Sequence, residues 1–532
     1  MSEPTDPAQD AAERIAAGYA STGPAVELGA VVLEGRPHPG ARVRLPLAML
    51  TRHGLIAGAT GTGKTKTLQL VAEQLSAAGV PVVVADLKGD LAGLVRPGAD
   101  GDRVRERVAA TGDTWTSTGF PVEYLALGGL GTGVPVRATV TDFGPVLLSK
   151  VLGLNATQES SLGLVFHHAD AVGLPLLDLA DLRAVLTWLT SKAGKAELEG
   201  LGGLSKATAG VILRQLVALE DLGGDVFFGE PEFEPADLLR TAADGRGVIS
   251  AVELPAIQDR PALFSTFLMW LLAELFEELP EVGDLDRPRL VFFLDEAHLL
   301  FTGASRAFLE AVTQTVRLIR SKGVGIFFVT QNPTDVPRAV LAQLGNRVQH
   351  ALRAFTPEDA DALARTVKTF PRSEDYDVAT LLTSLGTGEA AVTVLSERGA
   401  PTPLAWTVLR APRSHMGTVE PAELAAAVAA SPLLPRYGAP VDRESARELL
   451  AARLAPPAPV PQAEPGPLQP DPLPPLPSPW PEMDSPVPAP HRRRNSGDDL
   501  LEKALGSFAR SVGSALGREI TRGLFGTRRR RR

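Results

Sequence analysis

Short apolar runs alternate with amphipathic helical patterns from residue 51 to about residue 410. The clearest runs are residues 55–57, 82–85, 290–294 and 324–329, and each lacks the polar alternation of a half-exposed strand. Such runs are typical of strands that are buried on both faces of a sheet. We therefore predict an α/β fold in which helices cover a mostly parallel sheet.

Helical patterns are concentrated between residues 141 and 285, which we expect to form a mostly helical insert. Apolar side chains recur there at intervals of three and four residues in segments 161–168, 179–190, 207–219 and 261–279. The most apolar stretch, Ala262–Phe276, is interrupted by Ser265, Thr266 and Glu274. It is too short and too polar to cross a bilayer, so it predicts a buried helix and no transmembrane segment.

The remaining regions before residue 456 also differ in composition. We expect a flexible N-terminus over residues 1–25 and, over residues 26–50, a small β module of short strands joined by a Pro/Gly turn. The core then consists of residues 51–140 and 286–410. For residues 411–455 we expect a helical extension.

Proline dominates the next segment, where it occupies 16 of the 35 positions from 456 to 490. Because proline opposes helix and sheet formation, we expect an extended linker over residues 456–498. In residues 499–532, apolar positions at helical spacing predict an amphipathic helix, and the chain ends in five arginines. This end suits a nucleic-acid backbone, an anionic membrane surface or a protein partner, and it also suits a tail that only aids solubility.

Composition and charge narrow the class of protein. The 532 residues are 44% hydrophobic and 22% charged, as in soluble globular proteins, and they include no cysteine. Disulfides, thiol catalysis and cysteine zinc sites are therefore excluded, and the N-terminal residues do not resemble a signal peptide. We expect a cytoplasmic protein. Residues 491–532 carry 12 Lys and Arg against 4 Asp and Glu, whereas residues 1–490 carry 41 against 58, so an acidic body precedes a basic tail.

The strongest chemical signal follows the first apolar run and satisfies the pattern G-x-x-x-x-G-K-[ST]. Its glycines allow a tight turn whose backbone N–H groups face phosphate oxygens at the start of a helix. Lys64 would reach the β and γ phosphates, and the Thr65 hydroxyl would hold Mg²⁺. We assign nucleotide binding to Gly58, Ala59, Thr60, Gly61, Thr62, Gly63, Lys64, Thr65 and Lys66.

Three further runs end in polar side chains. Asp295 and Glu296 follow residues 290–294, and we expect Asp295 to bind the Mg²⁺ shell and Glu296 to act as the general base for water. Gln331 follows the run at 324–329 and either contacts the γ-phosphate and water or caps the strand. Asp86 and Asp90 follow the run at 82–85 and either approach the metal or cap a turn.

Four segments, in this order and with this spacing, together resemble the HerA/FtsK branch of P-loop motor ATPases. They are residues 58–65, Asp86-Leu87-Lys88-Gly89-Asp90, Asp295-Glu296-Ala297-His298 and Thr330-Gln331-Asn332. The resemblance covers about residues 40–410. It implies a RecA-like core, ATP hydrolysis with Mg²⁺, and a ring, usually a hexamer, that moves duplex DNA.

The same resemblance implies an arginine finger supplied by a neighbouring subunit. Arg320 is our first candidate and Arg317 the second, followed by Arg347 and Arg353. The chain departs from HerA itself because too few residues precede residue 51 to form a full N-terminal barrel. Three functions remain open: a DNA translocase or helicase, an ATPase that drives protein secretion or assembly, and a nucleotide-gated scaffold.

Overall fold

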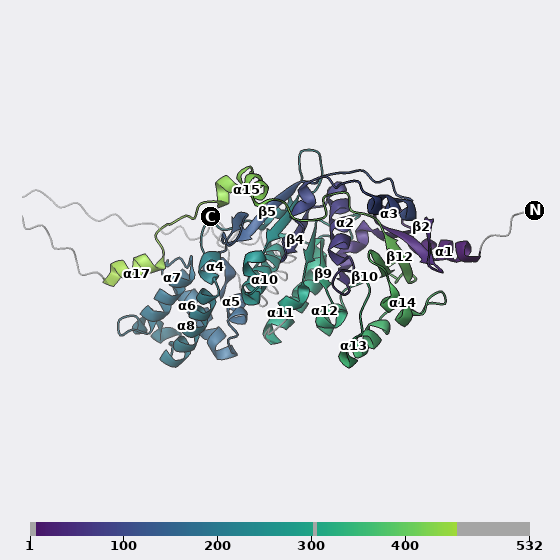
Figure 1. Cartoon of the computed structure of the whole chain (residues 1–532). Coiled ribbons are helices and arrows are strands. Elements are labelled where there is room, and N and C mark those ends of the chain that lie inside the picture. The colour runs from purple at the N-terminus through teal and green to yellow at the C-terminus, as the bar shows by residue number, and fades with distance from the viewer. Residues whose placement is uncertain (1–6, 302–305, 455–532) are drawn as a thin grey trace, which may run out of the picture.

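A twelve-stranded sheet forms the centre of the computed structural model, which describes residues 7–301 and 306–454 (Figure 1). The strand order is β2-β1-β12-β11-β10-β3-β9-β8-β4-β7-β5-β6. The strands are β1 (Ala25–Leu33), β2 (Arg36–Pro46), β3 (Gly54–Ala57), β4 (Val82–Asp86), β5 (Val122–Leu127), β6 (Val134–Val136), β7 (Ile249–Glu253), β8 (Leu290–Leu294), β9 (Val324–Thr330), β10 (Asn346–Gln349), β11 (Glu389–Thr393) and β12 (Ala405–Leu409).

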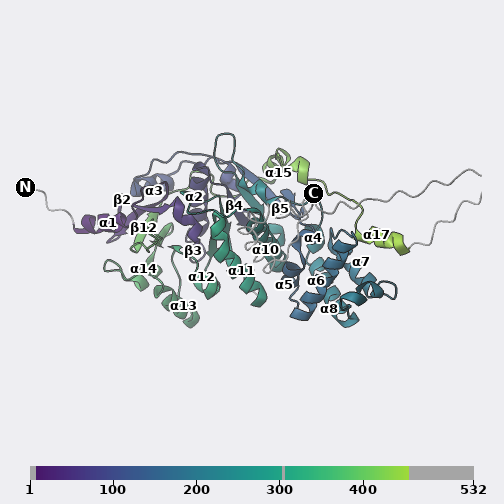
Figure 2. The ribbon, with the colours of Figure 1, turned by 180° about the vertical axis from the view of Figure 1, so that it is seen from behind.

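Helices cover this sheet and extend beyond one of its ends (Figures 1 and 2). They are α1 (Pro7–Ala17), α2 (Lys64–Ala77), α3 (Asp102–Thr111), α4 (Val140–Phe143), α5 (Pro145–Val151), α6 (Ala156–Ala171), α7 (Leu179–Leu189), α8 (Lys206–Asp221), α9 (Gly224–Phe227), α10 (Pro261–Glu278), α11 (Arg306–Ile319), α12 (Arg338–Leu341), α13 (Pro357–Val367), α14 (Val378–Ser384), α15 (Pro421–Ala429), α16 (Leu434–Tyr437) and α17 (Ala446–Leu454).

Parallel pairing joins the eight strands from β10 to β6, whereas β2, β1, β12 and β11 are antiparallel to their neighbours. β3 lies between β10 and β9, and β9 separates β3 from β8. This mostly parallel arrangement confirms the predicted RecA-like α/β fold. It also brings the carboxyl ends of β3, β9, β8 and β4 to one edge of the sheet, where open α/β sheets bind ligands.

Alternate residues of the central strands enter two different hydrophobic cores. In β4, Val83 and Ala85 pack in a core with α10 and the helices that precede it, while Val82 and Val84 pack in a core with α2. Both faces of these strands are therefore buried, and this explains their uninterrupted apolar sequence. The amphipathic segments expected within the insert coincide with α6, α7, α8 and α10.

The expected helical insert, however, is interrupted by a strand of the central sheet. β7 lies within residues 141–285 but pairs in parallel with both β4 and β5. Its sequence, Ile249-Ser250-Ala251-Val252-Glu253, is short and includes a serine, so it did not stand out as an apolar run. The helical layer is thus α4 to α9, and α10 is a connection that returns the chain to β8.

The N-terminal region also differs from the expectation. β1 and β2 form a hairpin whose turn is Glu34-Gly35, with φ angles of +49° and +74°. The Pro/Gly segment that was expected to form this turn comes later and lies within β2. Two consecutive positive φ angles suit a tight hairpin turn, and β2 tolerates proline because it is an edge strand. The hairpin is part of the main sheet through the pairing of β1 with β12.

Residues 7–17 form α1, where the composition predicted a flexible segment. Ala12 and Ile15 on this helix are buried, and the buried Tyr19 that follows has its hydroxyl 2.7 Å from the carbonyl oxygen of Val392 and 2.6 Å from that of Pro403. The contacts with residues nearly 400 positions later explain why the local sequence did not reveal this order.

At the other end of the chain, α15, α16 and α17 form the expected helical extension, and α17 packs against α7 (Figure 1). The predicted linker over residues 456–498 and the predicted amphipathic helix with its arginine tail over residues 499–532 lie outside the described residues. Within residues 7–301 and 306–454, none of the helices has the length and apolar character needed to span a membrane.

A buried histidine predicts how stability depends on pH. His53 accepts a hydrogen bond at Nδ1 from the N–H of Ile326 (3.1 Å), and burial lowers the pKa of His53 to about 4. The unfolded chain binds this proton below about pH 6.5, so the free energy of unfolding should fall between pH 6.5 and pH 4, by about 2 kcal/mol at pH 5 from this residue alone.

Urea unfolding midpoints at pH 7.5, 6 and 5 measure this effect. His53→Gln should flatten the dependence on pH, whereas His167→Gln, at an exposed position of α6, should leave it unchanged. Equal pH dependence in wild type and His53→Gln would contradict the assignment.

Candidate functional site

The glycine-rich loop joins β3 to α2, as its sequence predicted. Gly58 has a φ of +154° and Gly63 a φ of +113°, values that L side chains rarely adopt. A Cβ atom at Gly58 would also lie 2.5 Å from the Cβ of His350. These two glycines are therefore required by backbone conformation and by the close approach of the segment that follows β10.

Neighbouring strands hold the outside of this loop. The N–H of Gly58 donates to Thr330 at the end of β9 (3.2 Å), and the N–H of Ala59 donates to Ala351 (2.8 Å). The carbonyl oxygen of Thr62 accepts from the N–H of Gly388 (2.9 Å). The loop is thus anchored by backbone bonds to three segments that are distant in the sequence.

The inside of the loop is left available for an anion. In the described part of the chain, the N–H groups of Gly61, Gly63, Lys64 and Thr65 donate to no backbone carbonyl group, and no side chain caps the start of α2. A helix N-terminus with several free N–H groups attracts negative charge. The geometry therefore matches a phosphate cradle.

Lys64 brings a buried positive charge to this cradle. Its Nζ atom donates to the carbonyl oxygens of Gly58 (2.7 Å) and Ala59 (3.3 Å). Burial lowers the pKa of Lys64, while the negative charges of Glu296 and Asp295 oppose that shift. The structure therefore places Lys64 within electrostatic reach of both acids at the end of β8. Lys66 points elsewhere, with its Nζ atom 3.4 Å from Oε1 of Gln69.

Asp295 has the features of a metal ligand. It is only 2% exposed; Oδ1 accepts from the N–H of Glu296 (2.9 Å), and the buried Oδ2 has no hydrogen-bond partner among the described residues. Burial and the charge of Glu296 raise the pKa of Asp295 to about 7. An uncompensated buried carboxylate oxygen is costly unless a cation or proton satisfies it.

A single carboxylate is sufficient for Mg²⁺ at such a site, because this ion keeps several waters and binds phosphate oxygens directly. Accordingly, no cluster of three or more His, Cys, Asp or Glu residues suited to a metal occurs in residues 7–301 and 306–454. Thr65 lies in the first turn of α2 at the same edge of the sheet, so Thr65 and Asp295 are the two protein ligands that would hold Mg²⁺ there.

Glu296 is buried and held by two basic side chains. Its Oε1 accepts from Nζ of Lys88, and its Oε2 lies 3.3 Å from Nδ1 of His298. Burial would raise the pKa of Glu296, but Lys88, with His298 and Lys64 adding, keeps it below its ordinary value. Glu296 also adopts a φ of +45°, which is unusual for a residue other than glycine.

Of the two acids after β4, Asp86 caps the following turn. Its Oδ1 accepts from the N–H groups of Lys88 (3.1 Å) and Gly89 (2.7 Å), and its Oδ2 accepts from Leu91 (2.8 Å). Through these three hydrogen bonds Asp86 organises the loop that follows β4. Asp90 lies close enough to Asp295 for their charges to interact.

Gln331 follows β9 and therefore lies between the glycine-rich loop and the acids of β8. It lines a cavity of about 340 Å³ together with His298, Phe301 and Asp335. Its side chain is exposed, so the amide is accessible from this cavity. The neighbouring Asn332 accepts from the N–H of Thr334 and caps the turn after the strand.

The four candidate arginines differ in their position relative to this edge. Arg320 precedes β9, so it lies at the opposite, amino-terminal edge, with Nη2 3.9 Å from Oδ1 of Asp284. Arg317 and Arg353 are exposed, and Arg347 lies within β10, where Nη1 is 3.4 Å from the carbonyl oxygen of Thr369.

Two residues of the site were missed by sequence reasoning. His350 follows β10, and its Nε2 lies 2.8 Å from Oγ1 of Thr67 on α2; burial and the charge of Lys64 lower the pKa of His350 to about 4. Glu253 ends β7, and burial with the charge of Asp86 raises the pKa of Glu253 to about 8. Neither stands in a recognisable motif, so only the pairing of the strands reveals them.

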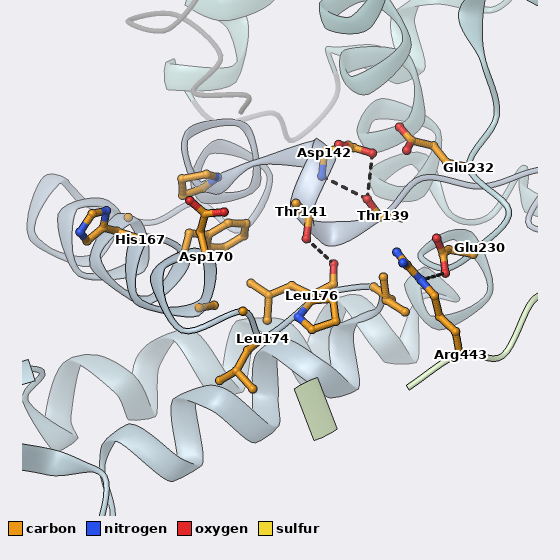
Figure 3. Close-up of a pocket in the computed structure, with 17 residues that line it drawn as sticks. Thr139, Thr141, Asp142, His167, Asp170, Leu174, Leu176, Glu230, Glu232 and Arg443 are labelled. Atoms are coloured by element: carbon orange, nitrogen blue, oxygen red, sulfur yellow. Dashed lines mark hydrogen bonds and ion pairs between the residues drawn. The ribbon is translucent and has the colours of Figure 1, made fainter. Parts of the chain in front are cut away.

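A larger cavity of about 790 Å³ lies in the helical layer and shares no lining residue with the glycine-rich loop. Figure 3 shows its carboxylates, Asp142, Asp170, Glu230 and Glu232, and the ion pair of Glu230 with Arg443 (2.6 Å). Asp142 also contacts Thr139 within a helix cap, so this carboxylate has a local structural role.

Several solved structures are similar to this chain. The conjugative coupling protein TrwB in an unbound form is 16% identical over 77% of this chain and 95% of that chain, with a TM-score of 0.49. TrwB in complex with ADP and Mg²⁺ is 16% identical over 76% and 94%, with a TM-score of 0.48. VirB4 of Thermoanaerobacter pseudethanolicus is 16% identical over 76% and 99%, with a TM-score of 0.46.

None of the curated proteins matches the sequence. A family model does match, and it is described as helicase HerA-like C-terminal. It covers residues 32–532, which include the glycine-rich loop, both acids of β8 and the strand that ends before Gln331. The chain therefore belongs to the helicase HerA-like C-terminal family.

Proposed function

We propose that this chain is an ATP-hydrolysing motor of the HerA/FtsK type that assembles into a ring, with a hexamer as the expected form, and moves duplex DNA. The observation that carries the ATPase assignment is the position of the uncapped phosphate cradle beside the buried pair Asp295 and Glu296. Membership of the HerA-like family supports the choice of a motor over other nucleotide-binding proteins.

The free N–H groups of the loop and the ammonium group of Lys64 would bind the phosphates of ATP. Thr65 and Asp295 would hold Mg²⁺, which neutralises charge that develops on the phosphates during their transfer. TrwB has been seen with ADP and Mg²⁺, which agrees with this ligand pair.

Hydrolysis requires a water molecule placed in line with the γ-phosphate. Glu296 would accept a proton from this water, and Gln331 would orient it or contact the phosphate oxygens. A neighbouring subunit would supply the arginine finger, with Arg320 as our first candidate. A ring is the assembly that brings such a finger to every site.

Two features of the chain bear on the substrate that the motor would move. The HerA-like family and the basic C-terminal residues, which offer charge for phosphate contacts, support DNA as the substrate. The net charge of −17 over residues 1–490 instead favours the alternatives, an ATPase for protein secretion or assembly or a nucleotide-gated scaffold.

Lys64→Ala should weaken ATP binding by roughly 100-fold, because a charge-assisted contact to phosphate contributes about 3 kcal/mol. Equilibrium titration with a fluorescent ATP analogue measures the affinity. Lys206→Ala, at the exposed start of α8, is the matched control. Equal affinity in wild type and Lys64→Ala would refute the phosphate cradle.

Glu296→Gln should retain ATP binding but lower the turnover rate by roughly 10²- to 10⁴-fold, because it removes the general base and keeps the cradle. Single-turnover hydrolysis, measured beside the binding titration, separates these effects. Glu199→Gln at an exposed position controls for loss of a carboxylate. Undiminished hydrolysis would remove Glu296 from the mechanism.

Duplex DNA should accelerate ATP turnover, and the effect should weaken as salt rises, because phosphate contacts release counterions. Steady-state ATPase rates at low and high salt, with and without a long duplex, provide the measurement. An ATP turnover rate that saturating DNA does not change at low salt would leave the ATPase assignment intact and favour secretion, assembly or scaffold roles.

A further inference from the structure

The loop after β4 holds a lysine to which the mechanism above assigns no role. Lys88 extends from this loop to Glu296, although 208 residues separate the two in the sequence. The Lys88 side chain is 46% exposed and that of Glu296 is 8% exposed. One partner of this ion pair is thus accessible to solvent and to ligands, while the other is enclosed.

The backbone that carries Lys88 is rigidly placed. Asp86 accepts hydrogen bonds from the N–H groups of Lys88, Gly89 and Leu91, and the side-chain amide of Gln258 donates to the carbonyl oxygen of Leu87. The loop therefore delivers the lysine to a defined position. Any movement of the charge arises from its flexible four-carbon side chain.

The backbone of Glu296 is equally constrained, because it lies at the end of β8 with a positive φ. Lys88 occupies Oε1, and His298 lies beside Oε2. A general base needs a carboxylate oxygen that is free to take a proton from water. Oε2 has no hydrogen-bond partner among the described residues, but the charge of Lys88 lowers the pKa of Glu296 and so weakens it as a base. Loosening of the ion pair would strengthen the base, and Lys88 is the more exposed partner.

Charge around Lys88 provides a reason for it to move. Glu296, Asp295 and Asp90 attract its ammonium group, and Lys64 on the facing helix lies near the same acids. A triphosphate bound by the loop would bring several negative charges to this position. Its terminal phosphate would compete with Glu296 for Lys88, whereas a diphosphate ends one phosphate earlier.

We propose that Lys88 is a positioning residue that holds Glu296 in an ion pair and transfers its ammonium group to the terminal phosphate when ATP binds. This inference rests on the proposed ATPase function. It makes the basicity of Glu296 depend on the presence of a third phosphate, so that the carboxylate is a stronger base when there is a phosphate to hydrolyse.

Binding of the full-length protein to ADP and to a non-hydrolysable ATP analogue, by calorimetry, tests the exchange without relying on turnover. Lys88→Met should lower the affinity for the ATP analogue by about tenfold, because one charged contact is lost, and should change the affinity for ADP by less than about twofold. Lys88→Arg should largely restore the preference for the analogue because it keeps the cation. Lys206→Met is the control for loss of a surface lysine.

A double-mutant cycle then tests whether Glu296 is the competing partner. Glu296→Gln should strengthen binding of the ATP analogue relative to ADP when Lys88 is present, and this gain should shrink in the Lys88→Met background. Equal gains in both backgrounds would overturn the exchange. So would a Lys88→Met variant that loses affinity for both nucleotides to the same extent.

Failure of the inference differs from failure of the proposed function. If the wild type binds neither nucleotide, the ATPase assignment fails and the role of Lys88 falls with it. If the wild type binds both nucleotides and Lys88→Met leaves their ratio unchanged, only the exchange is refuted, and the ion pair serves folding alone.

Discussion

Parallel pairing of β3, β9, β8 and β4 is the constraint on which the candidate site depends. Each of these strands ends in a different polar element: the glycine-rich loop, Gln331, the Asp295 and Glu296 pair, and the loop that carries Lys88. Because parallel strands end at the same edge, the pairing brings these elements together although they are not adjacent in the sequence. Hydrophobic burial of both strand faces maintains this alignment.

Buried charge is the second characteristic of the site. Lys64, Asp295 and Glu296 are all less than a tenth exposed, an arrangement that is unfavourable unless the charges compensate one another or meet a ligand. The partners found in the chain compensate Glu296 through Lys88, but they leave one oxygen of Asp295 without a hydrogen bond. The site is therefore electrostatically suited to a ligand that carries both phosphate and a divalent cation.

The elements outside the carboxyl edge of the parallel strands enclose the sheet and anchor the glycine-rich loop. The β1–β2 hairpin and α1 close one end of the sheet, and the helical layer with α15 to α17 covers the other (Figures 1 and 2). Segments far apart in the chain anchor the glycine-rich loop itself, since its backbone bonds reach Thr330, Ala351 and Gly388.

The sequence by itself determined the elements whose cause is local. Apolar runs marked β3, β4, β8 and β9, four of the eight parallel strands, and the glycine pattern marked the phosphate loop, because burial on two faces and positive φ angles restrict which residues occupy those positions. Only the tertiary structure decided the contacts of Lys88 with Glu296 and of Thr67 with His350, the order of α1 and the place of β7 in the sheet. These depend on segments tens to hundreds of residues apart, and the energy of such contacts leaves no periodic signal in the local sequence.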